Sequence, residues 1–171
     1  DEEGFRKLPA RAWPPSQPDA DKLEGLQMLF EECTARGEDN CDEKAFDLAT
    51  CYVFNNIDPN KGLALYKQLA DREKGHPDGT VAAGVVLVEG LGVPIDEQAG
   101  LKYLQKDAAM RTPQGSYELG TLYYTGVLND GDDGGDAQAF RYFQKSASSG
   151  HIGGMYMVAE MILNDEIPAA P

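Results

Sequence analysis

The residue types best suited to acid–base chemistry are few in this chain and lie far apart. It has two histidines in 171 residues. His76 precedes a proline in an apparent turn, and His151 directly follows Gly150. A general base needs a positioned partner group, and the spacing supplies neither histidine with one. We expect both histidines to have structural roles in turns.

The cysteines allow two interpretations. Cys33, Cys41 and Cys51 are the only cysteines and lie close together in the chain. The favoured interpretation is that they are small buried side chains. The alternative is a disulfide between Cys33 and Cys41 across the segment TARGEDN, which would leave one thiol over. The sequence leaves the redox compartment open between these alternatives.

Two loops resemble ligand-binding motifs only in part. The acidic segment NDGDDGGDAQ runs from Asn129 to Gln138, but a calcium loop beginning at Asp130 would place Arg141 at the closing glutamate position. We therefore expect a solvated insertion there and no tight calcium site. The segment GLGVP at Gly90 lacks the third glycine of a dinucleotide fingerprint and the Gly-Lys-Ser/Thr of a phosphate loop. We predict no catalytic residue, no cofactor and no metal site.

Charge and hydropathy narrow the range of partners. The formal net charge is −14, with an isoelectric point near 4.4. A polyanion repels phosphate backbones, so we predict that nucleic acid is not a partner. The same repulsion disfavours binding to anionic lipid. No run approaches the 18 apolar residues of a transmembrane helix, so we predict no transmembrane segment. The chain opens without an apolar signal segment or an initiating methionine, which favours a product processed after import or secretion. The compartment stays unassigned.

The elements that must position these residues form a degenerate repeat of about 38 residues. Two sets of small residues keep this period independently of each other. In the first helix of each unit they are Ala49, Gly84, Gly120 and Ala159, with steps of 35, 36 and 39. In the second helix they are Gly25, Gly62, Gly100 and Ala139, with steps of 37, 38 and 39. Fixed periods of this length indicate a stacked solenoid, in which no unit buries its apolar face alone.

The repeat predicts an all-α, right-handed solenoid of antiparallel helix pairs at residues 19–165. We expect a proline-rich extended arm at 1–18 before it and a short tail at 166–171 after it. The chain should begin on a second-type helix and end on a first-type helix. The predicted helices are about 20–36, 43–54, 59–74, 79–89, 96–111, 114–126, 137–149 and 153–164.

Close helix crossing explains the small residues. Gly120 is expected to meet Ala139 and Ala147 on the partner helix, because larger side chains would hold the two backbones apart. The larger Tyr123 and Tyr142 fill the space around that contact. The second-type helices also share a capping acid, four residues before the small anchor, at Asp21, Asp58 and Asp96.

These residues resemble the Sel-1-like repeat, a relative of the tetratricopeptide repeat with longer and more variable loops. One unit supplies Ala45, Leu48, Ala49, Tyr52, Asp58, Gly62, Tyr66 and Ala70. The next supplies Gly84, Gly90, Gly92, Val93, Asp96, Gly100, Tyr103, Leu104 and Ala108. The third supplies Leu119, Gly120, Tyr123, Gly126, Ala139, Tyr142, Phe143, Ala147 and Gly150. The resemblance covers residues 20 to 165, although the first loop lacks Gly-x-Gly and the third contains the acidic insertion.

The resemblance implies a non-catalytic scaffold or adaptor for protein partners, within a larger assembly. A sharper form is a peripheral or linker subunit of a large organellar or membrane-bound complex. The alternative is a secreted or periplasmic repeat protein with ligand-binding or enzyme-like activity, which would carry a disulfide framework. Tetratricopeptide-like offsets imply a concave binding face. The candidate partner-binding residues there are Phe46, Phe54, Val81, Val85, Tyr117, Tyr124 and Tyr156. A core role for these residues is the competing interpretation.

The two chain ends are the other predicted contact regions. Trp13 sits among prolines that stiffen the arm and lower the entropy lost on docking. The last helix has no partner helix after it and is rich in methionine, including Met157 and Met161. Flexible methionine side chains adapt well to protein surfaces. We therefore expect partner contact through the arm, the last helix or both, with the concave face as the third candidate.

Overall fold

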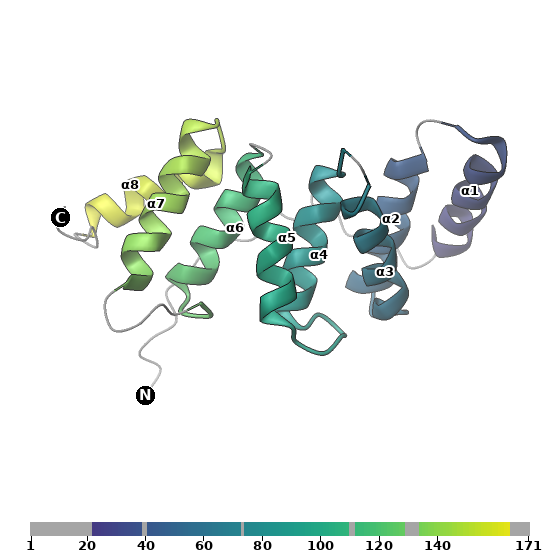
Figure 1. The fold of residues 1–171 in the computed structure, drawn as a ribbon, viewed down its shortest axis with the longest axis horizontal. Coiled ribbons are helices and arrows are strands. Elements are labelled where there is room, and N and C mark those ends of the chain that lie inside the picture. The colour runs from purple at the N-terminus through teal and green to yellow at the C-terminus, as the bar shows by residue number, and fades with distance from the viewer. Residues whose placement is uncertain (1–21, 39–40, 73, 110–111, 129–133, 165–171) are drawn as a thin grey trace. The chain divides into compact units, whose positions relative to one another are not determined.

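A computed structural model of the chain describes residues 22–38, 41–72, 74–109, 112–128 and 134–164 (Figure 1). The described residues contain eight α-helices and no β-strand. The helices are α1 (Leu23–Arg36), α2 (Cys41–Phe54), α3 (Pro59–Ala70), α4 (Pro77–Glu89), α5 (Glu97–Ala109), α6 (Pro113–Tyr124), α7 (Gly134–Ser148) and α8 (Ile152–Leu163). The predicted all-α architecture and the order of first-type and second-type helices are confirmed.

Several helix bounds differ from the predicted ones by one to four residues. Helix α4 begins at Pro77 and α6 at Pro113, each earlier than predicted. Proline suits the first position of a helix because its missing N–H would have no partner there. Helix α3 ends at Ala70, four residues before the predicted end, and the Asp71 N–H closes it by donating to the Lys67 carbonyl.

The chain divides into two compact units, one ending at Tyr103 and the other beginning at Leu104. In the first unit, α2 packs on both α1 and α3, and α4 packs on α3 (Figure 1). The small anchors meet in this unit as the repeat predicts. A Cβ atom added to Gly62 would lie 2.7 Å from the Ala49 carbonyl oxygen. One added to Gly100 would lie 2.7 Å from the Gly84 carbonyl oxygen.

The second unit is built around the α6–α7 pair, with α8 packed on α7. Its core contains Tyr117, Tyr124, Ala139, Phe143, Met157 and Met161. The predicted Tyr123–Tyr142 contact is present, with the rings stacked at 5.7 Å between centroids. The predicted neighbours of Gly120 were wrong in detail. The atoms nearest to a Cβ there, at 2.7 Å, belong to the Phe143 ring and not to Ala139 or Ala147.

The helix caps follow the repeat. The Asp58 carboxylate accepts the Lys61 N–H at 3.1 Å, and the Asp96 carboxylate accepts the Ala99 N–H at 3.0 Å. The third predicted cap, Asp21, lies outside the described residues, as do the arm at 1–18 and the tail at 166–171.

The favoured interpretation of the cysteines was wrong for two of them. Cys33 and Cys41 form a disulfide, with their Cα atoms 5.6 Å apart. Cys33 of α1 lies close to α2 because the two helices pack on each other and the connection between them is short. The bridge therefore ties α1 to the start of α2. Cys51 is buried within α2, and its sulfur accepts a hydrogen bond from the Asn55 side chain.

Candidate protein-interaction surfaces

Most of the predicted partner-binding residues lie in the interior. Val81, Val85, Tyr117, Tyr124, Met157 and Met161 are all buried. They belong to the core of their own repeats, which is the competing interpretation that the sequence left open. Phe46 and Phe54 are half-buried, whereas Tyr156 is 52% exposed. Trp13 lies outside the described residues.

Two of these aromatic residues each pack against a histidine that precedes the first turn of a later helix. The Phe46 ring stacks on His76 at 5.7 Å, and the Tyr117 ring lies 4.6 Å from His151. Both aromatic residues occupy the same position in the repeat, three residues before the small anchor of their helix. In these two repeats the aromatic residue therefore supports the junction with a later helix.

Both histidines act as helix caps, which agrees with the structural role predicted for them. His76 Nδ1 accepts the Gly79 N–H at 3.1 Å, and His151 Nδ1 accepts the Gly154 N–H at 3.0 Å. Each bond satisfies an amide of a helix's first turn, which has no partner within the helix. Histidine is not among the commonest capping residues, so propensity alone does not identify this role.

A polar chain continues from the second of these caps. His151 Nε2 lies 2.9 Å from the Gln114 side-chain oxygen, and the Gln114 amide donates to Glu118 at 2.9 Å. Because Nδ1 accepts a hydrogen bond, the proton of the neutral ring sits on Nε2 and is donated to Gln114. Burial lowers the pKa of His151 below its ordinary value of 6.5. The arrangement favours the neutral ring, which the cap requires.

Helix α8 presents the clearest exposed apolar surface. Ile152 is 82% exposed and Leu163 is 84% exposed, and Met155, Tyr156 and Ile162 are each about half exposed. The opposite side of the helix, with Met157 and Met161, packs into the core of its unit. Glu160 is the only charged residue between Ile152 and Leu163. The outer side of α8 is therefore both apolar and nearly uncharged.

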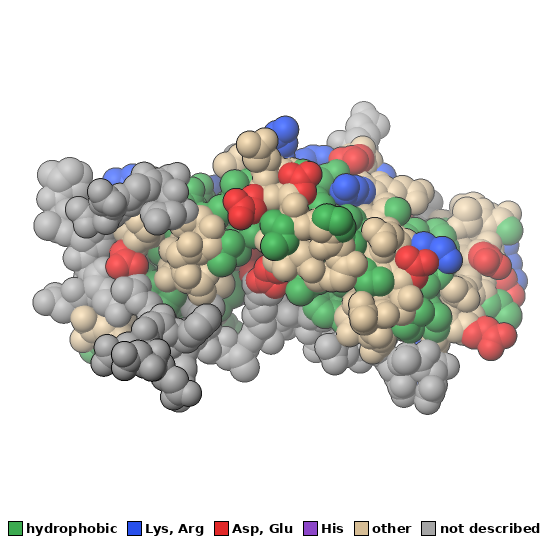
Figure 2. Space-filling view, turned by 90° about the horizontal axis from the view of Figure 1, so that it is seen from below, with side chains coloured by type: hydrophobic (Ala, Val, Ile, Leu, Met, Phe, Trp, Pro, Cys, Tyr) green, Lys and Arg blue, Asp and Glu red, His purple; other side chains and the backbone are tan. Residues whose placement is uncertain are grey.

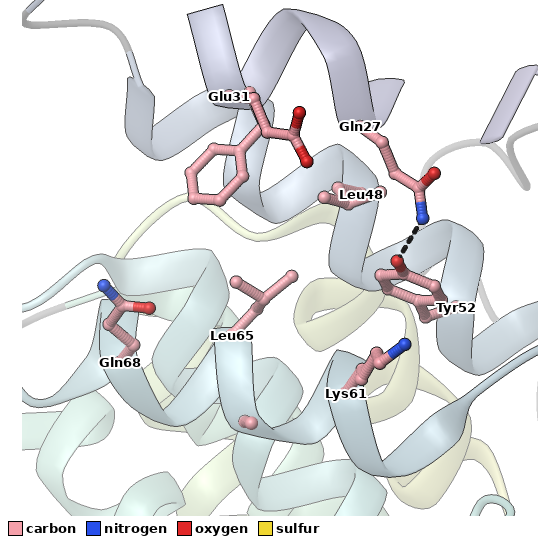
Figure 3. Close-up of a pocket in the computed structure, with 9 residues that line it drawn as sticks. Gln27, Glu31, Leu48, Tyr52, Lys61, Leu65 and Gln68 are labelled. Atoms are coloured by element: carbon pink, nitrogen blue, oxygen red, sulfur yellow. Dashed lines mark hydrogen bonds between the residues drawn. The ribbon is translucent and has the colours of Figure 1, made fainter. Parts of the chain in front are cut away.

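A groove of about 360 Å³ lies between α1 and α3, and α2 forms its floor (Figure 3). Gln27 on α1 donates a hydrogen bond to the Tyr52 hydroxyl across one end of the groove. The lining is mixed, with apolar Leu48 and Leu65 beside the charged Glu31 and Lys61 (Figure 3). This groove was not predicted from the sequence: Leu48 and Tyr52 belong to the repeat pattern, but the side chains of α1 and α3 that complete the lining lie outside it. It is a second, more polar candidate surface.

Acidic side chains are scattered over the visible face of the molecule in Figure 2 and do not gather in one patch. Such a distribution is typical of a solvated exterior. Part of the acidic insertion, residues 129–133, lies outside the described residues. Among the residues that the structure does describe, no three His, Cys, Asp or Glu side chains come together as a possible metal site.

Titration of the tyrosines also reflects packing. Burial raises the pKa of Tyr66, whose hydroxyl lies 2.7 Å from the Thr50 hydroxyl inside the α2–α3 pair. Partial burial, followed by the charge of Asp71, raises the pKa of Tyr103. Each shift follows from a side chain that lies between neighbouring helices. Within the described segments, no helix has the length and hydropathy needed to cross a membrane.

Comparison with known proteins supports the fold. No protein-family model matches the chain, and no curated protein matches it. A Sel1 repeat protein from Oxalobacter formigenes is similar in structure, with a TM-score of 0.60 and 17% sequence identity over 89% of this chain. The chain spans 64% of the length of that protein. A protective antigen of uropathogenic Escherichia coli with an SLR fold aligns at a TM-score of 0.49 and 19% identity, over 84% of this chain and 37% of its own. The first likeness, together with the repeat in the sequence, shows that this chain has the Sel-1-like repeat fold.

Proposed function

We propose that this chain is a non-catalytic protein-interaction scaffold and that a protein partner docks on the outer side of α8. The exposure of Ile152 and Leu163, at 82% and 84%, is the observation that supports this proposal. Apolar side chains that gather on one element, and do not lie scattered singly, are typical of interaction sites. Tyr156 and Met155 add residue types that are enriched in interfaces.

We further propose that the chain works as a peripheral or linker subunit of a larger assembly. Sel-1-like and tetratricopeptide-like folds commonly serve as adaptors, and the chain studied here has their architecture. The arm at 1–18, with Trp13 among its prolines, is a second contact in this proposal. Its support comes from the sequence alone, because the arm lies outside the described residues.

Paired substitutions test the role of α8. An Ile152→Ser, Leu163→Ser variant removes the two most exposed apolar side chains of the helix. The matched control is Ile95→Ser, Val127→Ser, since these two side chains are 64% and 45% exposed in loops. Native complexes would be isolated by mild affinity capture of the tagged chain and quantified by mass spectrometry.

We expect the α8 variant to lose co-purifying protein while its melting temperature stays within about 2 °C of the wild type, because exposed substitutions change stability little. The control variant should retain the same partners as the wild type. Full retention of every partner by the α8 variant would overturn the proposal and leave the α1–α3 groove as the next surface to test.

The disulfide supports a second proposal, concerning the compartment. Structural disulfides persist in oxidising environments and are rare in the reducing cytosol. We therefore propose that the chain functions in an oxidising compartment, as the secreted or periplasmic alternative requires. Cells would be quenched with acid and the chain alkylated under denaturing conditions without a reductant; mass spectrometry should then show one alkylated cysteine, Cys51. Three alkylated cysteines would contradict this proposal.

A further inference from the structure

The complete repeats show which side of a first-type helix its second-type partner covers. In α2, the covered residues are the small anchor and the third and fourth residues after it. A Cβ added to Gly62 of α3 would touch Ala49, Tyr52 and Val53, all within 3.1 Å. In α6, the residues at the same two later positions, Tyr123 and Tyr124, contact Tyr142 and Phe143 of α7. We call the anchor and these two positions the pairing side of a helix.

The pairing side of α8 is uncovered. Its three residues are the anchor Ala159, which is exposed, Ile162, which is 50% exposed, and Leu163, which is 84% exposed. In the complete pairs the fourth residue after the anchor is buried, at 5% exposure for Val53, 2% for Val88 and 7% for Tyr124. Contacts among the described residues therefore do not explain the small size of Ala159. It fits a second-type helix that lies close against α8.

The pairing side of α1, which is a second-type helix, is also uncovered among the described residues. A Cβ added to Gly25 would meet nothing within 4 Å, whereas the equivalent Gly62 and Gly100 lie against a neighbouring helix. Leu29, four residues after Gly25, is 47% exposed, but Tyr66, Leu104 and Phe143 at the same position have no exposed area. Met28 beside it is 57% exposed. Helix α1 is thus a second-type helix whose pairing side is covered by no helix of the described residues.

We propose that α1 of one copy of this chain packs on α8 of a second copy and completes the missing helix pair. The register comes from the α6–α7 pair, in which Tyr123 meets Tyr142 and Tyr124 meets Phe143. In the same register Gly25 lies against Ala159, Met28 against Ile162, and Leu29 against Leu163. This inference rests on the proposed function, because it names the partner that docks on α8.

Charge favours this occupant over an arbitrary helix. The three residues that form the pairing side of each helix are uncharged in both α1 and α8, so these six side chains bring no charge into the contact. Seven residues after Gly25, Glu32 occupies the position of Ser146, whose hydroxyl donates to the Pro113 carbonyl at the start of α6. Glu32 would therefore lie near the amino end of α8, where the helix dipole favours a carboxylate.

The association is head-to-tail, since each copy offers one α1 and one α8. Such heterologous contacts form rings where the rotation between copies closes and filaments where it does not. One helix pair is a small interface, so the association should be weak and depend on concentration. The net charge of −14 makes the copies repel one another. Added salt screens this repulsion, so the association should strengthen as salt rises.

The test is sedimentation velocity of the full chain at several concentrations. Ala159→Arg blocks the pairing side of α8, and Leu29→Glu blocks that of α1. Val127→Arg and Ile95→Glu are matched controls at exposed positions in loops. Gly25→Glu and Leu163→Arg provide a second, independent pair of blocking variants. Circular dichroism melting would confirm that every variant is folded.

We expect the wild type and both controls to exceed the mass of a monomer as concentration and salt rise. Each blocked variant alone should remain monomeric. A 1:1 mixture of Ala159→Arg and Leu29→Glu should form dimers and nothing larger, because one free α1 and one free α8 remain in each pair of copies. A monomeric wild type at all concentrations would overturn the inference, as would a mixture that stays monomeric.

The outcomes separate this inference from the proposed function. If the wild type is monomeric while Ala159→Arg loses capture of a different protein, the self-association is wrong and docking on α8 stands. If Ala159→Arg changes neither self-association nor capture, both are wrong. The mixture experiment is specific to a second copy, because no outside partner can restore a dimer of two blocked variants.

Discussion

Replacing two equivalent glycines with alanine should have opposite effects on stability. Gly25 and Gly62 occupy the same position in α1 and α3, near the start of each helix and within the same compact unit. Alanine favours a helix by up to about 1 kcal/mol relative to glycine, and by about half of that near a helix end. Both substitutions share this gain. They differ in the space that the new methyl group enters.

The contacts of the added methyl group determine the sign. At Gly25 it meets nothing within 4 Å, so Gly25→Ala should stabilise the unit by about 0.5 kcal/mol. At Gly62 it would lie 2.5 Å from a Val53 methyl and 2.7 Å from the Ala49 carbonyl oxygen. The carbonyl belongs to helix backbone and cannot rotate away, so the pair must separate at a cost of about 2.5 kcal/mol. The net loss for Gly62→Ala is about 2 kcal/mol.

Thermal and urea unfolding of the two variants would measure this difference. For a unit of this size each kcal/mol shifts the melting temperature by about 4–8 °C, so the variants should melt roughly 10–20 °C apart. The experiment belongs at low protein concentration, where self-association is absent. A Gly62→Ala variant as stable as Gly25→Ala would refute the reasoning, since it would mean that the α2–α3 pair is not closely packed at its anchor.

Three further predictions concern other parts of the chain. Gly120→Leu should destabilise the second unit by about 3 kcal/mol, because its Cβ alone would lie 2.7 Å from the buried Phe143 ring; calorimetry showing an unchanged melting temperature would contradict this. The lowered pKa of His151 means that the folded state binds a proton less readily than the unfolded state, so its contribution to stability is present above pH 6.5 and is lost as pH falls below that value. Urea unfolding at several pH values should show this dependence, and His151→Asn, which retains a capping side chain, should flatten it. Replacing Cys33 and Cys41 with alanine should cost about 2.5 kcal/mol by the loop-entropy relation for their separation of 8 residues, and hydrogen exchange should speed up in α1 before α2.

The helices and their pairing could be predicted from the sequence because small anchors and aromatic residues repeat with one period. The same regularity obscured the binding residues. Val81 and Val85 lie at offsets that line a concave face in related folds, yet here they are buried. Tyr117 is covered because His151 packs against it to cap α8. A capping histidine has weak sequence propensity, so its effect on a neighbouring aromatic residue could not be foreseen.

The side of the last helix that is exposed, and the disulfide near the amino end, could be predicted only in part. The sequence predicted partner contact through the last helix, but it assigned Met157 and Met161 to the contact surface. The structure reverses this and exposes Ile162 and Leu163. Which side chains of α8 face the core depends on how the helix is rotated about its own axis where it packs on α7. Because apolar residues lie on nearly every side of α8, the sequence does not determine this rotation. The bridge between Cys33 and Cys41 likewise needed the distance between two Cα atoms, which spacing in sequence does not fix.

The short span of the disulfide has a consequence for biosynthesis. Its two thiols are separated by 8 residues, so they emerge from a ribosome or a translocation channel almost together. Closing so small a loop needs no long-range search by the chain, and such closures are fast compared with the folding of a whole domain. The crosslink can therefore form while most of the repeats are still being made. The first helix would then already be joined to the second when the later repeats arrive, which gives assembly a direction from the amino end.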